Sequence, residues 1–76
     1  MKNEDIANEF AKEFQSFYKT KIAVSVDGCK MLVKSSGKKT IKSIAHDISL
    51  ACAIAKRNVD FSVEYNHTYQ LIVNFK

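Results

Sequence analysis

Residues 40–57 read TIKSIAHDISLACAIAKR, and their apolar side chains recur at steps of three and four residues. We predict a helix from Thr40, whose hydroxyl can cap the first turn, to Arg57, whose charge suits the negative end of the helix dipole. Asn58 is expected to take a left-handed conformation just after it. The spacing places one apolar stripe on a single helix face, made of Ile41, Ile44, Ala45, Ile48, Ala51, Cys52 and Ala55.

A second set of apolar side chains lies off this stripe. Leu50 and Ala53 point roughly opposite to it, and Ile54 lies on its edge. Contact with a neighbouring helix would explain them, and so would a docking patch for a partner protein or a second copy.

The segments around this helix predict the other elements. Asn3 to about Lys19 has helical spacing, with Asn3 as the cap and an acidic ridge at Asp5, Glu9 and Glu13. Such a ridge suits either open solvent or a basic partner, and we favour solvent.

Two alternating segments predict two hairpins. One covers residues 21–34 and turns at Asp27-Gly28, which is a strong two-residue turn signal. The other covers residues 59–75 and turns at Asn66-His67, with Asn66 as the better left-handed residue.

The order helix, hairpin, helix, hairpin predicts the α+β class. We expect a two-layer sandwich, αββαββ, in which a mostly antiparallel four-stranded sheet carries both helices on one face. A helical connection makes the second and third strands parallel, which leaves strand orders 2-1-3-4 and 1-2-4-3, and we prefer the former. The element order resembles the core of LAGLIDADG homing endonucleases. Because the defining motif and its acidic metal-binding residues are absent from the sequence, that resemblance implies no activity here.

Length and composition predict one small domain over residues 1–76. The chain is 46% hydrophobic and has no apolar run long enough to span a membrane, so we expect a cytoplasmic protein without a membrane partner. Cys29 and Cys52 lie far apart in sequence and are predicted to be buried free thiols.

Positive charge gathers in residues 30–57, where Asp47 is the only acidic residue. Backbone amides at a helix start attract anions, and nearby lysines strengthen the attraction. A P-loop is excluded because Leu32 stands where its first glycine is needed. The candidate anion or nucleic-acid site is Lys30, Lys34, Ser36, Gly37, Lys38, Lys39 and Lys42.

Single-strand readers usually carry aromatic side chains on an open sheet face. Here the alternation places Phe61, Tyr65, Tyr69 and Phe75 on the inward face, where we expect them to be core. Nucleic-acid binding is therefore the alternative rather than the first hypothesis.

Catalysis and metal binding find no support in the residue pattern. His46 and Asp47 are adjacent and so diverge on a helix, and no cysteine or histidine pair has zinc-site spacing. We predict a non-enzyme without metal or cofactor.

A protein-binding role fits best. Exposed sheet edges offer a route for partner strands, and the candidate protein-facing or dimer-forming side chains are Leu32, Leu50, Ala53, Ile54 and Ile72. We expect a small regulatory or inhibitory module of the phage or mobile-element type that is a monomer or homodimer and binds an unidentified protein.

Overall fold

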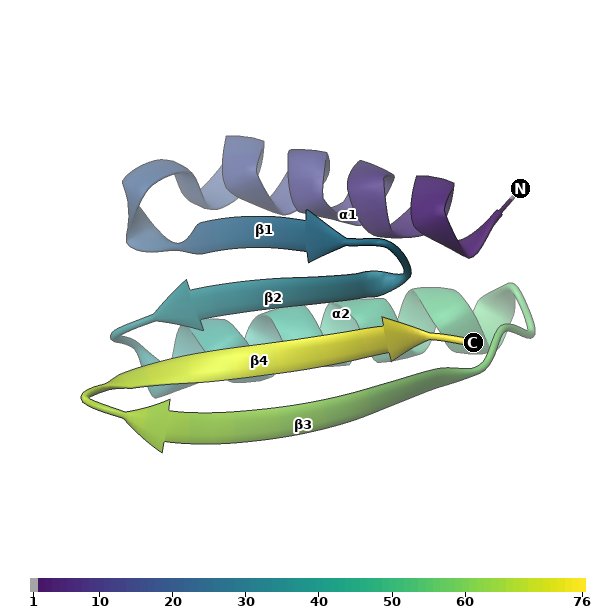
Figure 1. The fold of residues 1–76 in the computed structure, drawn as a ribbon. Helices are drawn as coiled ribbons and strands as arrows, with labels where there is room; N and C mark the ends of the chain where they lie inside the picture. Colours follow the sequence, from purple (N-terminus) through teal and green to yellow (C-terminus); the bar gives the residue numbers. More distant parts are fainter. Residues whose placement is uncertain (1) are drawn as a thin grey trace.

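The computed structural model describes residues 2–76 and confirms the predicted class and element order. Two helices lie on one face of a four-stranded antiparallel sheet and run in opposite directions (Figure 1). The elements are α1 (Asn3–Tyr18), the short 3₁₀ turn η1 (Lys19–Lys21), β1 (Ala23–Asp27), β2 (Lys30–Ser35), α2 (Lys38–Ile54), β3 (Val59–Asn66) and β4 (Thr68–Phe75).

The strand order is β1-β2-β4-β3, so the preferred order 2-1-3-4 is wrong and its alternative is the one found. Burial explains the choice. The central strands are those whose inward side chains the helices cover completely, namely Met31 and Val33 of β2 and Leu71 and Val73 of β4. The inward side chains of the outer strands are only partly covered.

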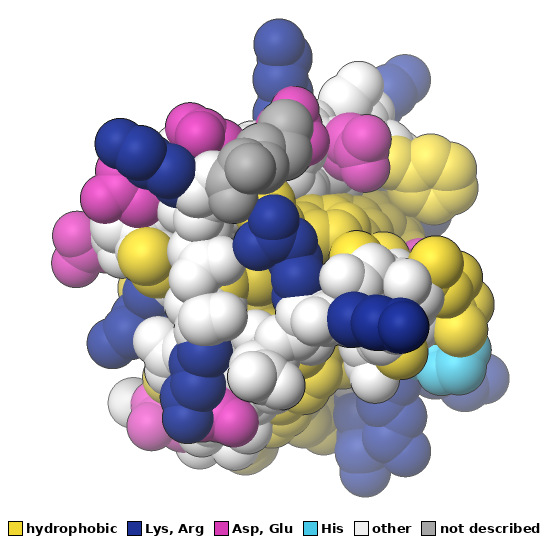
Figure 2. Space-filling model, turned by 90° about the vertical axis from the view of Figure 1, so that its right-hand side faces the viewer, with side chains coloured by type: hydrophobic (Ala, Val, Ile, Leu, Met, Phe, Trp, Pro, Cys, Tyr) yellow, Lys and Arg dark blue, Asp and Glu magenta, His cyan; other side chains and the backbone are white. Residues whose placement is uncertain are grey.

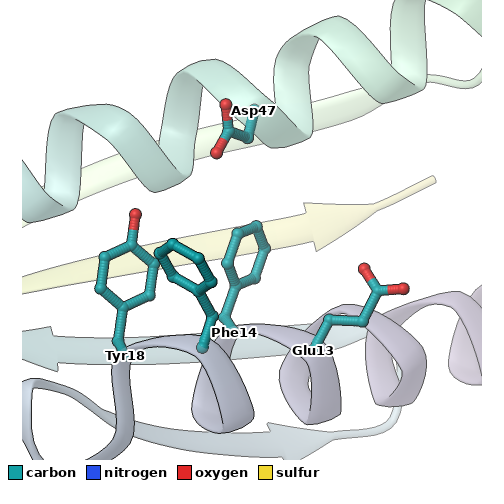
Figure 3. Close-up of a pocket in the computed structure, with 5 residues that line it drawn as sticks. Glu13, Phe14, Tyr18 and Asp47 are labelled. Carbon is teal, nitrogen blue, oxygen red and sulfur yellow. The ribbon is translucent and has the colours of Figure 1, made fainter.

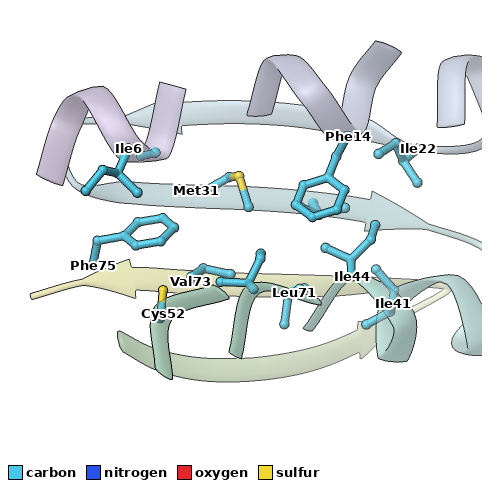
Figure 4. Close-up of a cluster of buried hydrophobic side chains, with 13 residues drawn as sticks. Ile6, Phe14, Ile22, Met31, Ile41, Ile44, Cys52, Leu71, Val73 and Phe75 are labelled. Atoms are coloured by element: carbon cyan, nitrogen blue, oxygen red, sulfur yellow. The ribbon is translucent and has the colours of Figure 1, made fainter. Parts of the chain in front are cut away.

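The core is one cluster between the sheet and the two helices (Figure 4). α1 contributes Ile6, Ala7 and Phe14, while α2 contributes the predicted stripe positions that face the sheet, Ile41, Ile44, Ile48 and Cys52. Leu71, Val73 and Phe75 of β4 complete the centre. Burying such side chains is the main favourable term in folding, at about 1.5–3 kcal/mol each.

The first hairpin turns one residue later than predicted. Asp27 pairs with Lys30, so the two-residue loop is Gly28-Cys29, and Gly28 takes the positive φ of 62°. Glycine suits the first position of such a loop because it has no Cβ to clash. Cys29 is consequently exposed in the turn, and the prediction that it is buried is wrong, whereas Cys52 is buried.

Both helix starts also differ from the prediction. α2 begins at Lys38 behind Gly37, and the Gly37 backbone N–H donates to Ser35 Oγ at 3.1 Å. Thr40 therefore lies in the first turn rather than at the cap. α1 begins with Asn3 itself, whose side-chain oxygen accepts from Arg57 Nη1 at 3.1 Å.

The left-handed residues after α2 and at the second turn are not the asparagines. α2 ends at Ile54, earlier than predicted, so the reversal falls on Lys56 with φ 58°. The Lys56 N–H donates to the Ala53 carbonyl and the Arg57 N–H to the Cys52 carbonyl, which is the Schellman pattern. In the second turn His67 has φ 65°.

Candidate functional site

A groove runs between α1 and α2, because both helices pack on the sheet and leave space between them. One end is a hollow of about 260 Å³ lined by α1 and by Asp47 of α2. In Figure 3 Phe14 and Tyr18 rise from α1 toward α2, and Asp47 points back across the gap. The other end, about 250 Å³, lies between Phe10 of α1 and Ala51 of α2.

Aromatic rings floor this groove. Phe10 stacks on Phe75 of β4 with ring centroids 5.7 Å apart and on Phe14 at 5.9 Å, and Phe14 leads on to Tyr18 at 6.3 Å. Positions 10, 14 and 18 are four residues apart and so share one helix face. The floor is therefore apolar and held in place by ring packing.

The walls of the groove are acidic. Glu9 and Glu13 of the α1 ridge line it, and Asp47 faces them from α2. Arg57 is the basic residue at the end near the α1 N-terminus, and its side chain donates to Asn3. The other charged residues that line these hollows are acidic.

The rim of the groove exposes large apolar side chains. Phe17, which lines the hollow near Asp47, is 78% exposed, and on α2 Leu50 and Ile54 are 54% and 77% exposed. Ile54 lies two turns after Asp47 on the same side of α2, at the edge of the groove, whereas Leu50 points further toward solvent, away from the sheet. From the end where both termini lie, Figure 2 shows hydrophobic side chains in a hollow with acidic side chains on one side of it.

A second apolar surface lies on the inward face of β3. Phe61, Val63 and Tyr65 are 37%, 56% and 66% exposed, so the prediction that Phe61 and Tyr65 are core is wrong. The cause is the position of α2, which contacts β2 and β4 more than β3. On the central strand β4, Phe75 is buried in the core as expected, and Tyr69 is half-buried and packs against the core.

The predicted anion site is divided. Lys34 and the segment from Ser36 to Lys42 gather at the end of the domain where β2 leads into α2, and η1 lies at the same end (Figure 1). Lys30 is at the opposite end of β2, about 13 Å away for four strand residues. There it aligns with Asn74, which in turn aligns with Asp60, and Asp60 is paired with Lys76.

The predicted protein-facing residues also fall into two groups. Leu32 and Ile72 are directly paired and half-buried on the open sheet face. Leu50, Ala53 and Ile54 are exposed on α2, in the helical layer. The structure therefore does not bring the two groups together.

The two thiols differ in their surroundings: Cys29 is exposed and Cys52 is buried. Burial raises the pKa of the Cys52 thiol, and the charge of Arg57 offsets only part of that rise. Within residues 2–76, no three His, Cys, Asp or Glu side chains are arranged to hold a metal ion. No helix of that same part of the chain is both long and apolar enough to cross a membrane.

Sequence reasoning missed the groove residues Glu9, Glu13, Asp47 and Phe17 as a group. Two signals pointed to them: the acidic ridge at four-residue steps, and more aromatic side chains on one helix than a two-layer core can cover. The sequence does not show how far apart the two helices pack on the sheet, and this separation is what opens the groove. The chain matches no protein-family model, and no curated protein is detectably similar to it.

Proposed function

We propose that this protein is a non-catalytic binding module that takes a basic amphipathic helix of a partner protein into the groove between α1 and α2. The observation that carries the proposal is the combination of an aromatic floor, acidic walls and an exposed apolar rim in one groove.

The length of the groove suits a helix. α1 and α2 contain 16 and 17 residues, so the groove is about 24 Å long at 1.5 Å per residue. A helix laid in a groove presents apolar anchors at three- and four-residue steps. Phe17, Leu50 and Ile54 on the rim would pack against those anchors and leave solvent.

The acidic walls of the groove favour a partner helix with basic side chains. Glu9, Glu13 and Asp47 line the walls, and within residues 2–76 none of the three forms an ion pair with a lysine. Lysine or arginine on the flanks of the partner helix would meet these carboxylates and speed association. Regulation or inhibition would follow if the bound helix is one that the partner needs elsewhere.

The test uses a designed 16-residue peptide with leucine on one face, lysine on the other and one tryptophan. The domain contains no tryptophan, so fluorescence reports on the peptide alone. We expect binding that weakens with salt and falls about tenfold or more in Glu13→Lys with Asp47→Lys. The matched control, Asp27→Lys with Glu64→Lys, changes charge equally on the sheet and should bind as the wild type does. Equal loss in both variants, or no binding, refutes the proposal.

Nucleic-acid binding is the second candidate, supported by the lysines gathered at one end of the domain. Lys38, Lys39 and Lys42 lie in the first turns of α2, where backbone amides are free. Fluorescence anisotropy with labelled oligonucleotides tests it: binding should fall steeply with salt, and Lys38→Glu with Lys39→Glu should abolish it. If no oligonucleotide binds at low salt, nucleic-acid binding is refuted, and the proposal of helix binding in the groove is unaffected.

A further inference from the structure

We propose that two copies of this protein pair through β3, edge to edge and antiparallel, to form one eight-stranded sheet. The two outer strands of the monomer differ in a way that points to this. On the β1 side, the Gln15 side chain donates to the Ile22 carbonyl at 3.1 Å and accepts from the Val24 N–H at 3.1 Å. An α1 residue thus covers part of that edge.

The β3 edge has no such cover. Among residues 2–76, no side chain hydrogen-bonds to the outer backbone groups of this eight-residue strand. Long, uncovered edge strands are templates for pairing with another chain, and proteins normally shield them.

The backbone pattern identifies which residues face outward. The Lys76 N–H donates to the Asn58 carbonyl at 3.0 Å, which makes positions 58 and 76 a hydrogen-bonded pair in the β3–β4 register. Such pairs alternate along an antiparallel ladder, so Asp60, Ser62 and Glu64 bond to β4. Val59, Phe61, Val63 and Tyr65 therefore direct their N–H and C=O groups to the free edge, and the same residues carry the exposed apolar side chains.

Charge selects one register for a symmetric pair. Outward-directed residues must face one another, and the two registers that pair most of β3 place Val63 opposite either the second copy's Val63 or its Phe61. The second choice places Asp60 directly opposite the other copy's Glu64, and like charges across a ladder are unfavourable. In the first, Glu64 faces Ser62 and Asp60 faces Asn66.

The favoured register also matches the apolar side chains. Phe61 faces the second copy's Tyr65, and Val63 faces its own counterpart, so the two exposed strips become one strip between the two α2 helices. The side-chain area covered is roughly 300 Å² per copy, which is small for a stable interface. The pairing should therefore be reversible and visible at high protein concentration.

The test is sedimentation equilibrium together with residue-resolved amide exchange over a concentration series. We expect the mass to rise from 8.6 kDa toward twice that value as the protein concentration increases. The amides of Phe61, Val63 and Tyr65 should become protected with concentration, while those of Ser62 and Glu64 are protected throughout. A monomer at every concentration refutes the pairing, as does a dimer that leaves the three amides unprotected.

Two variants of neighbouring residues test the interface and the register. Val63→Lys places like charges opposite each other and should weaken the dimer roughly tenfold or more. Ser62→Lys would face Glu64 of the second copy and should strengthen it, whereas in the rejected register it would face itself and weaken it. Circular dichroism of both variants verifies that the monomer is folded.

Discussion

Removing the Gln15 side chain is the most direct test of how the β1 edge of the sheet is covered. Its amide group makes three hydrogen bonds: it donates to the Lys19 carbonyl at 2.7 Å and the Ile22 carbonyl at 3.1 Å, and accepts from the Val24 N–H at 3.1 Å. One side chain therefore ties the end of α1, the turn η1 and the start of β1 together. We predict that Gln15→Ala destabilises the domain and uncovers the β1 edge.

The magnitude follows from the exposure of the bonded groups. A protein hydrogen bond contributes about 0.5–1.5 kcal/mol net, and since two of these three are at exposed sites, we take the lower part of that range. The sum is about 1.5–2 kcal/mol. For a chain of this length that lowers the melting temperature by roughly 6–16 °C.

Urea and thermal unfolding followed by circular dichroism measure the effect. Asn8→Ala is the matched control, because Asn8 is also a polar α1 residue but makes one exposed bond, to the Glu4 carbonyl at 2.9 Å. Its unfolding free energy should change by less than about 0.5 kcal/mol. If Gln15→Ala is as stable as Asn8→Ala, the three contacts do not secure the β1 edge and the contrast with β3 is lost.

Three further substitutions or measurements follow from the structure. Lys56→Gly should raise the unfolding free energy by about 1 kcal/mol, measured in urea, because Lys56 has a φ of 58° that glycine adopts without strain. A thiol-reactive dye should label Cys29 at once, and Cys52 only when denaturant opens the core, since Cys52 is buried and burial raises the pKa of its thiol; rapid labelling of both would contradict the described core. Leu50→Glu should leave the unfolding free energy within about 0.5 kcal/mol yet weaken binding of the basic peptide, and an unfolded variant would show that Leu50 is core.

The sequence predicted the elements because their signals are local. Helical spacing in residues 40–57, and alternation in residues 59–75, each depend only on which face of one element is apolar. The αββαββ order and the two-layer arrangement follow from those faces. Ile44, Ile48 and Cys52 were placed in the core for this reason, and they are buried.

Where the structure differs from the prediction, the difference is either a shift of a few residues or the result of contacts between elements far apart in the sequence. The turn at Gly28-Cys29 and the cap at Gly37 differ from the prediction by one to three residues, because several polar or small residues compete for each position. The strand order depends on which strands have their inward faces covered by the two helices. The sequence pattern of any one segment therefore cannot predict it. For the same reason, alternation correctly put Phe61 and Tyr65 on the inward face but could not show that this face lies beyond α2.

The position of α2 accounts for both apolar surfaces. Its side chains Ile41, Ile44 and Ile48 fix it over the central strands, and that leaves an open flank on each side. On the α1 side lies the groove, with Leu50 and Ile54 on its rim; on the other side lies the strip along β3. A shift of α2 toward β3 would cover Val63 but widen the groove, so within this two-helix layer one apolar surface shrinks only as the other grows. The second half of α2 accordingly carries apolar side chains on more than one side: Cys52 meets the sheet, Ala51 lines the groove, and Ile54 lies at the edge of the groove.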